Sequence, residues 1–248
     1  MLRKPIKFIA SKEYINYTKI KPEPSVLNVP QWFKDLNHSV ENRTVKGCMP
    51  FLDTLTSGYI LKMPIDYYIH HNALKDGERG TIGMTLVGVN PHNELTINLN
   101  VNKQSADVHP VKQLSKGCPY TQKNKDLAFH KILNPWLIKT PPGYSCLFLP
   151  PMNNADDRFS IIPGIVDTDG HPTRINFPIV VNGDKYPALD TTIKMGTPYV
   201  QIIPFKREQW KMKIESETQE KRNETILTLG SKVINGYKTN WWHKKSWK

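Results

Sequence analysis

Short runs of β-branched and aromatic residues, each followed by turn residues, recur from residue 59 onward and constrain the fold of this chain more than any other feature. Such runs are typical of strands, and pairs such as Asp169-Gly170 and Asn182-Gly183 are typical of the tight turns between them. No helix of about 10 residues is evident between the runs, so the pattern favours antiparallel pairing over βαβ units. The predicted strands are 4–9, 59–70, 80–88, 94–100, 127–139, 145–149, 159–166, 173–181, 191–194 and 199–205.

This rhythm predicts a mainly β protein, an antiparallel β-sandwich or jelly roll of cupin-like appearance, with one C-terminal α-helix. We expect residues 1–40 to form an extended N-terminal arm that packs on the domain, and residues 41–215 to form the sandwich. Residues 216–248 would form the helix and a basic, aromatic tail. Residues 101–126 are polar and lack periodicity, which indicates a long surface excursion. Within the arm, residues 31–36 predict one amphipathic turn that buries Trp32.

The predicted C-terminal helix spans about residues 216–235. Ser216 suits the N-cap, and Glu217 and Glu220 favour the positive end of the helix dipole. Apolar residues recur behind them at helical spacing, which supports a helix. They are Ile226, Leu229, Val233 and Tyr237.

Charge and cysteine content limit the compartment and the partners. The net charge of +12 favours an acidic partner such as nucleic acid or another protein. The three cysteines form no C-x-x-C pair, so we expect free thiols in a reducing compartment, with Cys146 packed in the core. We also expect no signal peptide and no membrane span, because no apolar run approaches about 20 residues.

The densest group of potential metal ligands is Asp167, Asp169 and His171, whose oxygen and nitrogen atoms suit Mg²⁺, Mn²⁺ or Fe²⁺. The competing interpretation is structural. Asp169-Gly170 lies between two predicted strands and is typical of a solvated hairpin turn. We therefore expect no metal and no other cofactor, and keep these residues, with His70, as the ligands should one bind.

The remaining catalytic motifs are weak. The adjacent His70 and His71 would face opposite sides of a strand, so at most one of them enters a pocket. Seven of the eight histidines are not followed two residues later by Asp or Glu, as the iron site of jelly-roll oxygenases requires, and only His92, with Glu94, has this spacing. The sequence also lacks a G-x-S-x-G nucleophile motif and the glycine-rich phosphate loops.

Five stretches carry a resemblance to a known family: VPQWF (29–33), KGCMP (46–50), NPWLIKTPPGY (134–144), GTPYVQIIPFKRE (196–208) and the tail from Tyr237 to Trp247. On these the chain resembles an uncharacterised family found in tailed phages of marine bacteria, including T4-like phages of cyanobacteria. The resemblance implies a viral protein that acts in the host cytoplasm or in the virion. It implies no reaction and no catalytic residues.

Three hypotheses about function follow. The first is a non-catalytic phage protein, a virion structural or assembly component that binds a protein partner, for which oligomerisation is plausible. The alternative is a jelly-roll metal-dependent enzyme, an oxygenase or isomerase, that gathers His70, His109, His130 or His171 from separate strands. The second alternative is a nucleic-acid-binding module that uses the positive charge.

The tail is the predicted partner-binding site. Exposed tryptophans are costly, so the tail must either fold back on its own domain or bury itself in a partner. Aromatic anchors beside lysines suit a protein groove with an acidic rim, or stacked bases beside phosphates. The residues are Tyr237, Trp241, Trp242, Lys244, Lys245 and Trp247.

Overall fold

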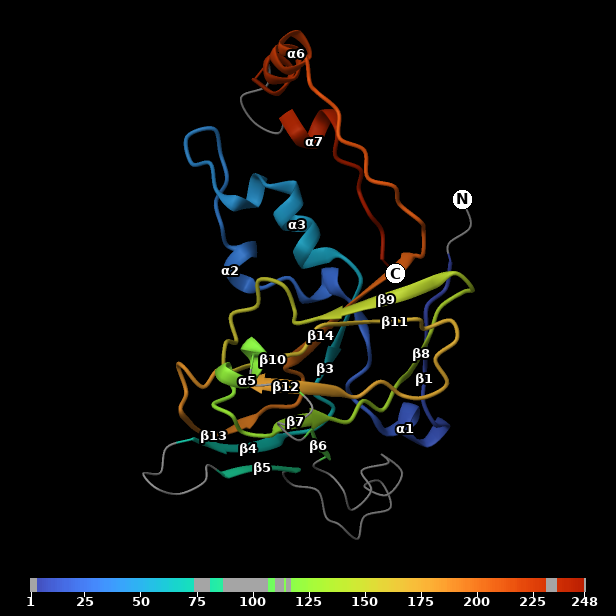
Figure 1. The fold of residues 1–248 in the computed structure, drawn as a ribbon, viewed down its shortest axis with the longest axis vertical. Coiled ribbons are helices and arrows are strands. Elements are labelled where there is room, and N and C mark those ends of the chain that lie inside the picture. Colours follow the sequence, from blue (N-terminus) through green and yellow to red (C-terminus); the bar gives the residue numbers. More distant parts are fainter. Residues whose placement is uncertain are drawn as a thin grey trace. The chain divides into compact units, whose positions relative to one another are not determined.

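The computed structural model describes residues 4–73, 81–86, 107–109, 114, 117–230 and 236–247, with no account of the side chains of 81–86 and 107–109. These residues form two compact units (Figure 1). Unit 1 comprises Met1–Glu23 and Tyr59–Lys206, and unit 2 comprises Pro24–Gly58 and Arg207–Lys248. The division differs from the three segments expected from the sequence, because unit 2 combines two stretches that are distant in the chain.

Unit 1 contains the β-sheets. One sheet has the strand order β11 (Gly164–Val166), β9 (Tyr144–Leu149), β14 (Pro198–Lys206), β3 (Tyr59–Lys62) and β2 (Glu23–Pro24). A second has the order β10 (Phe159–Ile161), β12 (Phe177–Val181), β7 (Phe129–Ile132) and β6 (Asp107–His109). A third has the order β13 (Ala188–Ile193), β4 (Tyr67–Asn72) and β5 (Thr81–Leu86), and β1 (Lys7–Ile9) pairs with β8 (Leu137–Lys139).

The described strand pairs with a defined register are all antiparallel, which confirms the mainly antiparallel β prediction. Figure 1 shows the sheet of β7 and β12 between the sheet of β9 and β14 and the sheet of β4 and β13. One hydrophobic core joins side chains from all of these sheets, with Cys146 inside it as predicted. Its largest fully buried members include Phe148 and Tyr199.

Strand β4 shows how the sequence sets the two faces of a sheet. Alternate residues of a strand point to opposite faces. Tyr67, Ile69 and His71 are accordingly buried, whereas Tyr68 and His70 lie on the outer face. The expectation that only one residue of the His70-His71 pair faces inward is confirmed, and the inward residue is His71.

The predicted strand 159–166 is two strands, β10 and β11, and only β10 pairs antiparallel with the strand after the Asp169-Gly170 turn, β12, as the predicted hairpin requires. The strand before the turn, β11, pairs with β9, whereas the strand after it, β12, pairs with β10 and β7. The turn therefore carries the chain from one sheet to another. Local turn residues specify the reversal of the chain but not the strand that the next segment joins.

The expected surface excursion at 101–126 is wrong for its described part. Helix α5 (Pro119–Lys123) and strand β6 occupy it, and Thr121 and Asn124 are fully buried. The predicted strand 94–100 lies outside the described residues. Helix α1 (Lys12–Tyr17) was not predicted from the sequence. Its recognisable signal is the N-cap Ser11, whose side chain accepts a hydrogen bond from the Tyr14 N–H.

Unit 2 is mainly helical. Its N-terminal part contains the 3₁₀ turns η1 (Ser25–Asn28) and η2 (Val45–Gly47) and the helices α2 (Gln31–Lys34) and α3 (Met49–Thr56). Helix α2 confirms the predicted turn, but the predicted burial of Trp32 is wrong. Trp32 is 41% exposed and Phe33 is the buried residue, stacked on Phe51 of α3 with ring centroids 5.8 Å apart. A single helical turn buries one face, and here that face carries Phe33.

The C-terminal helix differs from its prediction. Helix α6 (Gln219–Gly230) begins three residues after Ser216, at the point where Thr218 accepts hydrogen bonds from Lys221 and Arg222. Residues 231–235 lie outside the described part, and a second helix, α7 (Gly236–Asn240), contacts α6. No residue of α6 is buried, and its Ile226 and Leu229 are exposed.

Candidate functional site

At the turn after β11, the two predicted carboxylate ligands accept hydrogen bonds within unit 1. Asp167 accepts the hydroxyl of Ser145 at 2.6 Å, and Asp169 accepts the backbone N–H of Gly143 at 2.8 Å. His171 lies 3.3 Å from the hydroxyl of Thr173. The two carboxylate contacts hold the turn against strand β9. Asp167 and Asp169 therefore have a structural role, although the sequence predicted a solvated turn.

The other predicted ligand, His70, lies on a different sheet. Its Nδ1 contacts Oδ1 of Asp190 on β13, and the same oxygen accepts the hydroxyl of Tyr68 at 2.9 Å. These two hydrogen-bonding contacts lower the pKa of Asp190, and the contact with His70 has the larger effect. This group lies on the outer face of the β4–β13 pair.

A second histidine group is buried and was not foreseen. His71 of β4 and His130 of β7 are 0% and 1% exposed, and their ring centroids lie 6.2 Å apart. Within the described part of the chain, both ring nitrogens of His71 and Nε2 of His130 lack a hydrogen-bond partner. Burial lowers the pKa of each imidazole to about 4, because the cation cannot be solvated there.

Two histidines of the enzyme hypothesis, His70 and His171, do not lie with His130, while only the backbone of His109, on the strand that pairs with β7, is described. His70 lies on the outer face of β4, and His130 lies in the core. His171 belongs to the turn after β11, and the backbone of His109 lies in β6. Over the described ranges, no group of three or more His, Cys, Asp or Glu side chains is arranged to hold a metal ion.

The predicted partner-binding tail is partly engaged within unit 2. Trp242 donates its Nε1–H to Oδ2 of Asp53 on α3 at 3.0 Å, and Lys245 pairs with the same oxygen at 2.5 Å. Tyr237 and Trp241 remain exposed on and after α7. Of the two alternatives for the tail, Trp242 and Lys245 thus follow the first, because they fold back on Asp53 of the same unit. Partner binding remains a prediction for the exposed residues, which include Lys244.

We expect Asp53→Ala to release the tail, because one carboxylate oxygen holds both Trp242 and Lys245. Limited digestion with trypsin should then cleave after Lys244 and Lys245 several-fold faster than in the wild type. The loss of two partly exposed hydrogen bonds should cost about 1–2 kcal/mol. Asp35→Ala, which removes an exposed carboxylate on the first segment of unit 2, is the matched control. Equal cleavage in the two variants would contradict the anchoring role.

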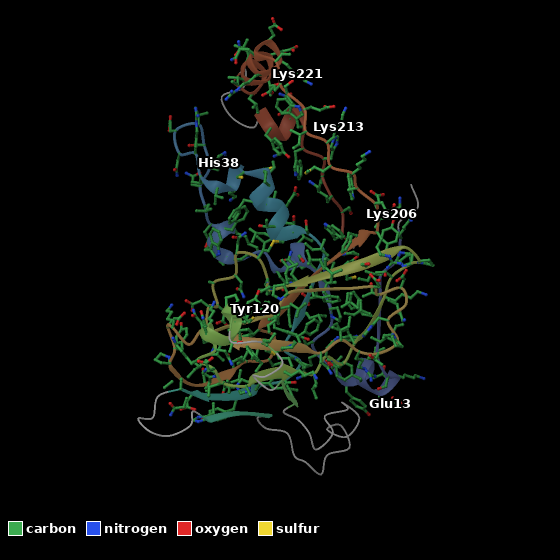
Figure 2. All side chains as sticks on the ribbon, viewed as in Figure 1. Glu13, His38, Tyr120, Lys206, Lys213 and Lys221 are labelled. Atoms are coloured by element: carbon green, nitrogen blue, oxygen red, sulfur yellow. The ribbon has the colours of Figure 1, made fainter. Side chains whose placement is uncertain are left out.

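The most exposed apolar side chains of the described chain precede α6. Trp210, Met212 and Ile214 are 88%, 84% and 86% exposed. They occupy alternate positions of a segment that belongs to no helix or sheet, and Lys211 and Lys213 lie between them. Figure 2 shows side chains projecting from this segment, with Lys213 labelled. Isolated exposed apolar residues are ordinary, but three at one spacing in one segment form an unpaired apolar row.

This row lies at the end of the segment predicted to form the sandwich, and no binding role was predicted for it. Its signal is the strict alternation from Trp210 to Ile214, which is typical of a strand with one buried face. In a fold that supplied a neighbouring strand, the same pattern would have been buried. The exposure is therefore a property that only the structure reveals.

Comparison with known proteins adds no assignment. No model of a known protein family matches the chain, and no curated protein matches it. Across the described helices, none is long and apolar enough to cross a membrane.

Proposed function

We propose that this chain is a non-catalytic protein-binding component, a structural or assembly protein of a phage particle, which attaches through residues 207–218. The observation that carries the proposal is the apolar row of Trp210, Met212 and Ile214. Side chains of this size, when buried, each contribute about 1.5–3 kcal/mol. Because all three side chains are exposed in the free chain, this burial free energy becomes available only when a partner covers them.

The spacing of the row favours a partner that supplies the edge of a β-sheet. In an extended segment, alternate side chains share one face, so Trp210, Met212 and Ile214 would contact the partner together. The backbone groups between them would pair with the exposed edge. Lys211 and Lys213 would remain on the solvent side.

The charge of this segment favours protein over nucleic acid. Its three basic residues are balanced by three acidic ones, so it carries no net charge. Affinity for phosphate backbones requires an excess of positive charge. The basic residues are Arg207, Lys211 and Lys213, and the acidic ones are Glu208, Glu215 and Glu217.

Unit 1 would serve as the scaffold, a sandwich of the jelly-roll, cupin-like type. Its antiparallel sheets around one core support this, and the resemblance to a tailed-phage family supports a place in the virion or the host cytoplasm. The scattered histidines weigh against the metal-dependent enzyme. A homo-oligomer of this chain would be one form of such an assembly.

The test is the presence of the protein in purified phage particles. We expect quantitative mass spectrometry to find it there in stoichiometric amounts. The variant Trp210→Ser/Met212→Ser/Ile214→Ser should fold normally and be depleted from particles by about tenfold or more, because hot-spot aromatic and aliphatic anchors dominate binding.

The matched control changes the opposite face of the same segment. Lys211→Ser/Lys213→Ser should leave incorporation within about twofold of the wild type, since exposed charges contribute little to affinity. Thermal unfolding should be the same for both variants, because neither alters a buried residue. Particles that lack the wild-type protein, or that incorporate the triple variant normally, would contradict the proposal.

A further inference from the structure

Unit 1 contains a cavity of about 740 Å³ that no role described so far uses. It lies between the connection from β1 to α1, the connection from β7 to β8, and the segment that leads into β12. Ile9, Leu133 and Leu137 form its apolar part. Thr173, Arg174 and Asn176 are among the residues that form its polar part. Small-molecule sites have this volume range and this mixture of surfaces.

The polar wall is held in place before any ligand arrives. The side chain of Asn134 donates to the carbonyl of Trp136 at 2.7 Å and accepts the N–H of Trp136 at 3.1 Å. Its backbone N–H donates to Oδ1 of Asn176 at 3.0 Å. Arg174 donates through Nε to the carbonyl of Pro135 at 3.0 Å. These bonds tie the segment before β12 to the β7–β8 connection and fix the direction of the guanidinium.

The guanidinium of Arg174 is not neutralised. Its two terminal nitrogens make no hydrogen bond with the described residues, and no described Asp or Glu lines the cavity. A guanidinium whose Nε is anchored presents its remaining N–H groups as a donor pair for a carboxylate or a phosphate.

We propose that this cavity binds a small organic anion, whose carboxylate or phosphate group contacts Arg174 while an apolar body packs against Ile9, Leu133 and Leu137. Both anionic groups match the donor geometry of the guanidinium. The cavity is large enough for a ligand with a fused aromatic ring, because sites of about 300–1,000 Å³ bury drug-sized molecules. This site is independent of the apolar row in unit 2.

The test uses three probes with the same apolar body: 1-naphthoate, 1-naphthyl phosphate and the neutral 1-naphthamide. Titration calorimetry on the full chain should detect both anions more tightly than the amide. Arg174→Gln should weaken the two anions by at least about tenfold and change the amide less than about twofold, since only the anions use the charged donor pair. The tighter of the two anions identifies the preferred head group.

Two further variants guard against a general effect on folding. Thr173→Trp, at an exposed position of the wall, should fill the cavity and abolish binding of all three probes while Arg174 remains. Arg222→Gln removes the same charge from α6 in unit 2 and should leave binding unchanged. The proposal is wrong if neither anion binds at millimolar concentration, or if Arg174→Gln and Arg222→Gln bind the anions equally well.

Discussion

The free energy of unfolding of unit 1 should fall steeply between pH 6.5 and pH 5. His71 and His130 have folded pKa values of about 4, below the ordinary value of 6.5, because burial disfavours their cations. Between these two values the unfolded state binds more protons than the folded state, so stability is lost as the pH falls. Each unit of pKa shift corresponds to about 1.4 kcal/mol, so the pair should cost several kcal/mol by pH 4.

Urea unfolding at pH 7, 6, 5.5 and 5 measures this slope. The carboxylates with lowered pKa, such as Asp66 and Asp190, lose their contribution only at lower pH, so this window reports the histidines. The variant His71→Leu/His130→Leu should flatten the slope. His243→Asn, at an exposed position of the tail, should not. A slope as steep in the double variant as in the wild type would show that other groups cause the loss.

Asn124→Ala should cause the largest loss of stability of any single substitution considered. The side chain is fully buried and donates to the carbonyls of Leu127 and Ala128 at 2.8 and 3.2 Å. Its Oδ1 accepts the N–H of Val181 on β12 at 2.9 Å. Alanine leaves these backbone groups unsatisfied, at about 1–3 kcal/mol each, so the total should reach about 3–5 kcal/mol.

Thermal unfolding measures this effect, with an expected fall in Tm of about 10 °C or more. Asn16→Ala, on the exposed face of α1, removes the same side chain from a solvated position and should change Tm by about 2 °C at most. A small effect of Asn124→Ala would show that water replaces the lost bonds, which the complete burial of the residue argues against.

Local patterns predicted the strands well but not their partners. The alternation in β4 and the turn at Gly196, whose φ is +88°, are properties of a few neighbouring residues. The pairing of β11 with β9 and of β12 with β7 depends on residues far apart in the chain. A tight hairpin at Asp169-Gly170 was the natural local interpretation, but β11, directly before the turn, pairs with β9, and only the earlier β10 pairs with β12.

The site predictions failed for a related reason. His71 and His130 are separated by 58 residues and carry no motif, so no spacing rule identifies their proximity. The alternation at Trp210, Met212 and Ile214 was visible in the sequence, but alternation normally indicates a buried strand face. None of the described strands pairs with this segment, and a single sequence does not specify which strands a fold places beside it.

The composition of unit 2 from two distant stretches has a consequence for synthesis. Pro24–Gly58 leaves the ribosome first, and about 150 residues follow before Arg207–Lys248 emerges. At about 5–20 residues per second, this first stretch waits roughly 8–30 s for the second half of its unit, while unit 1 receives its whole chain. During that interval Asp53 has neither Trp242 nor Lys245 to bind. A chain that stops before Trp242 would therefore lack both of these partners of Asp53, a residue of the first stretch.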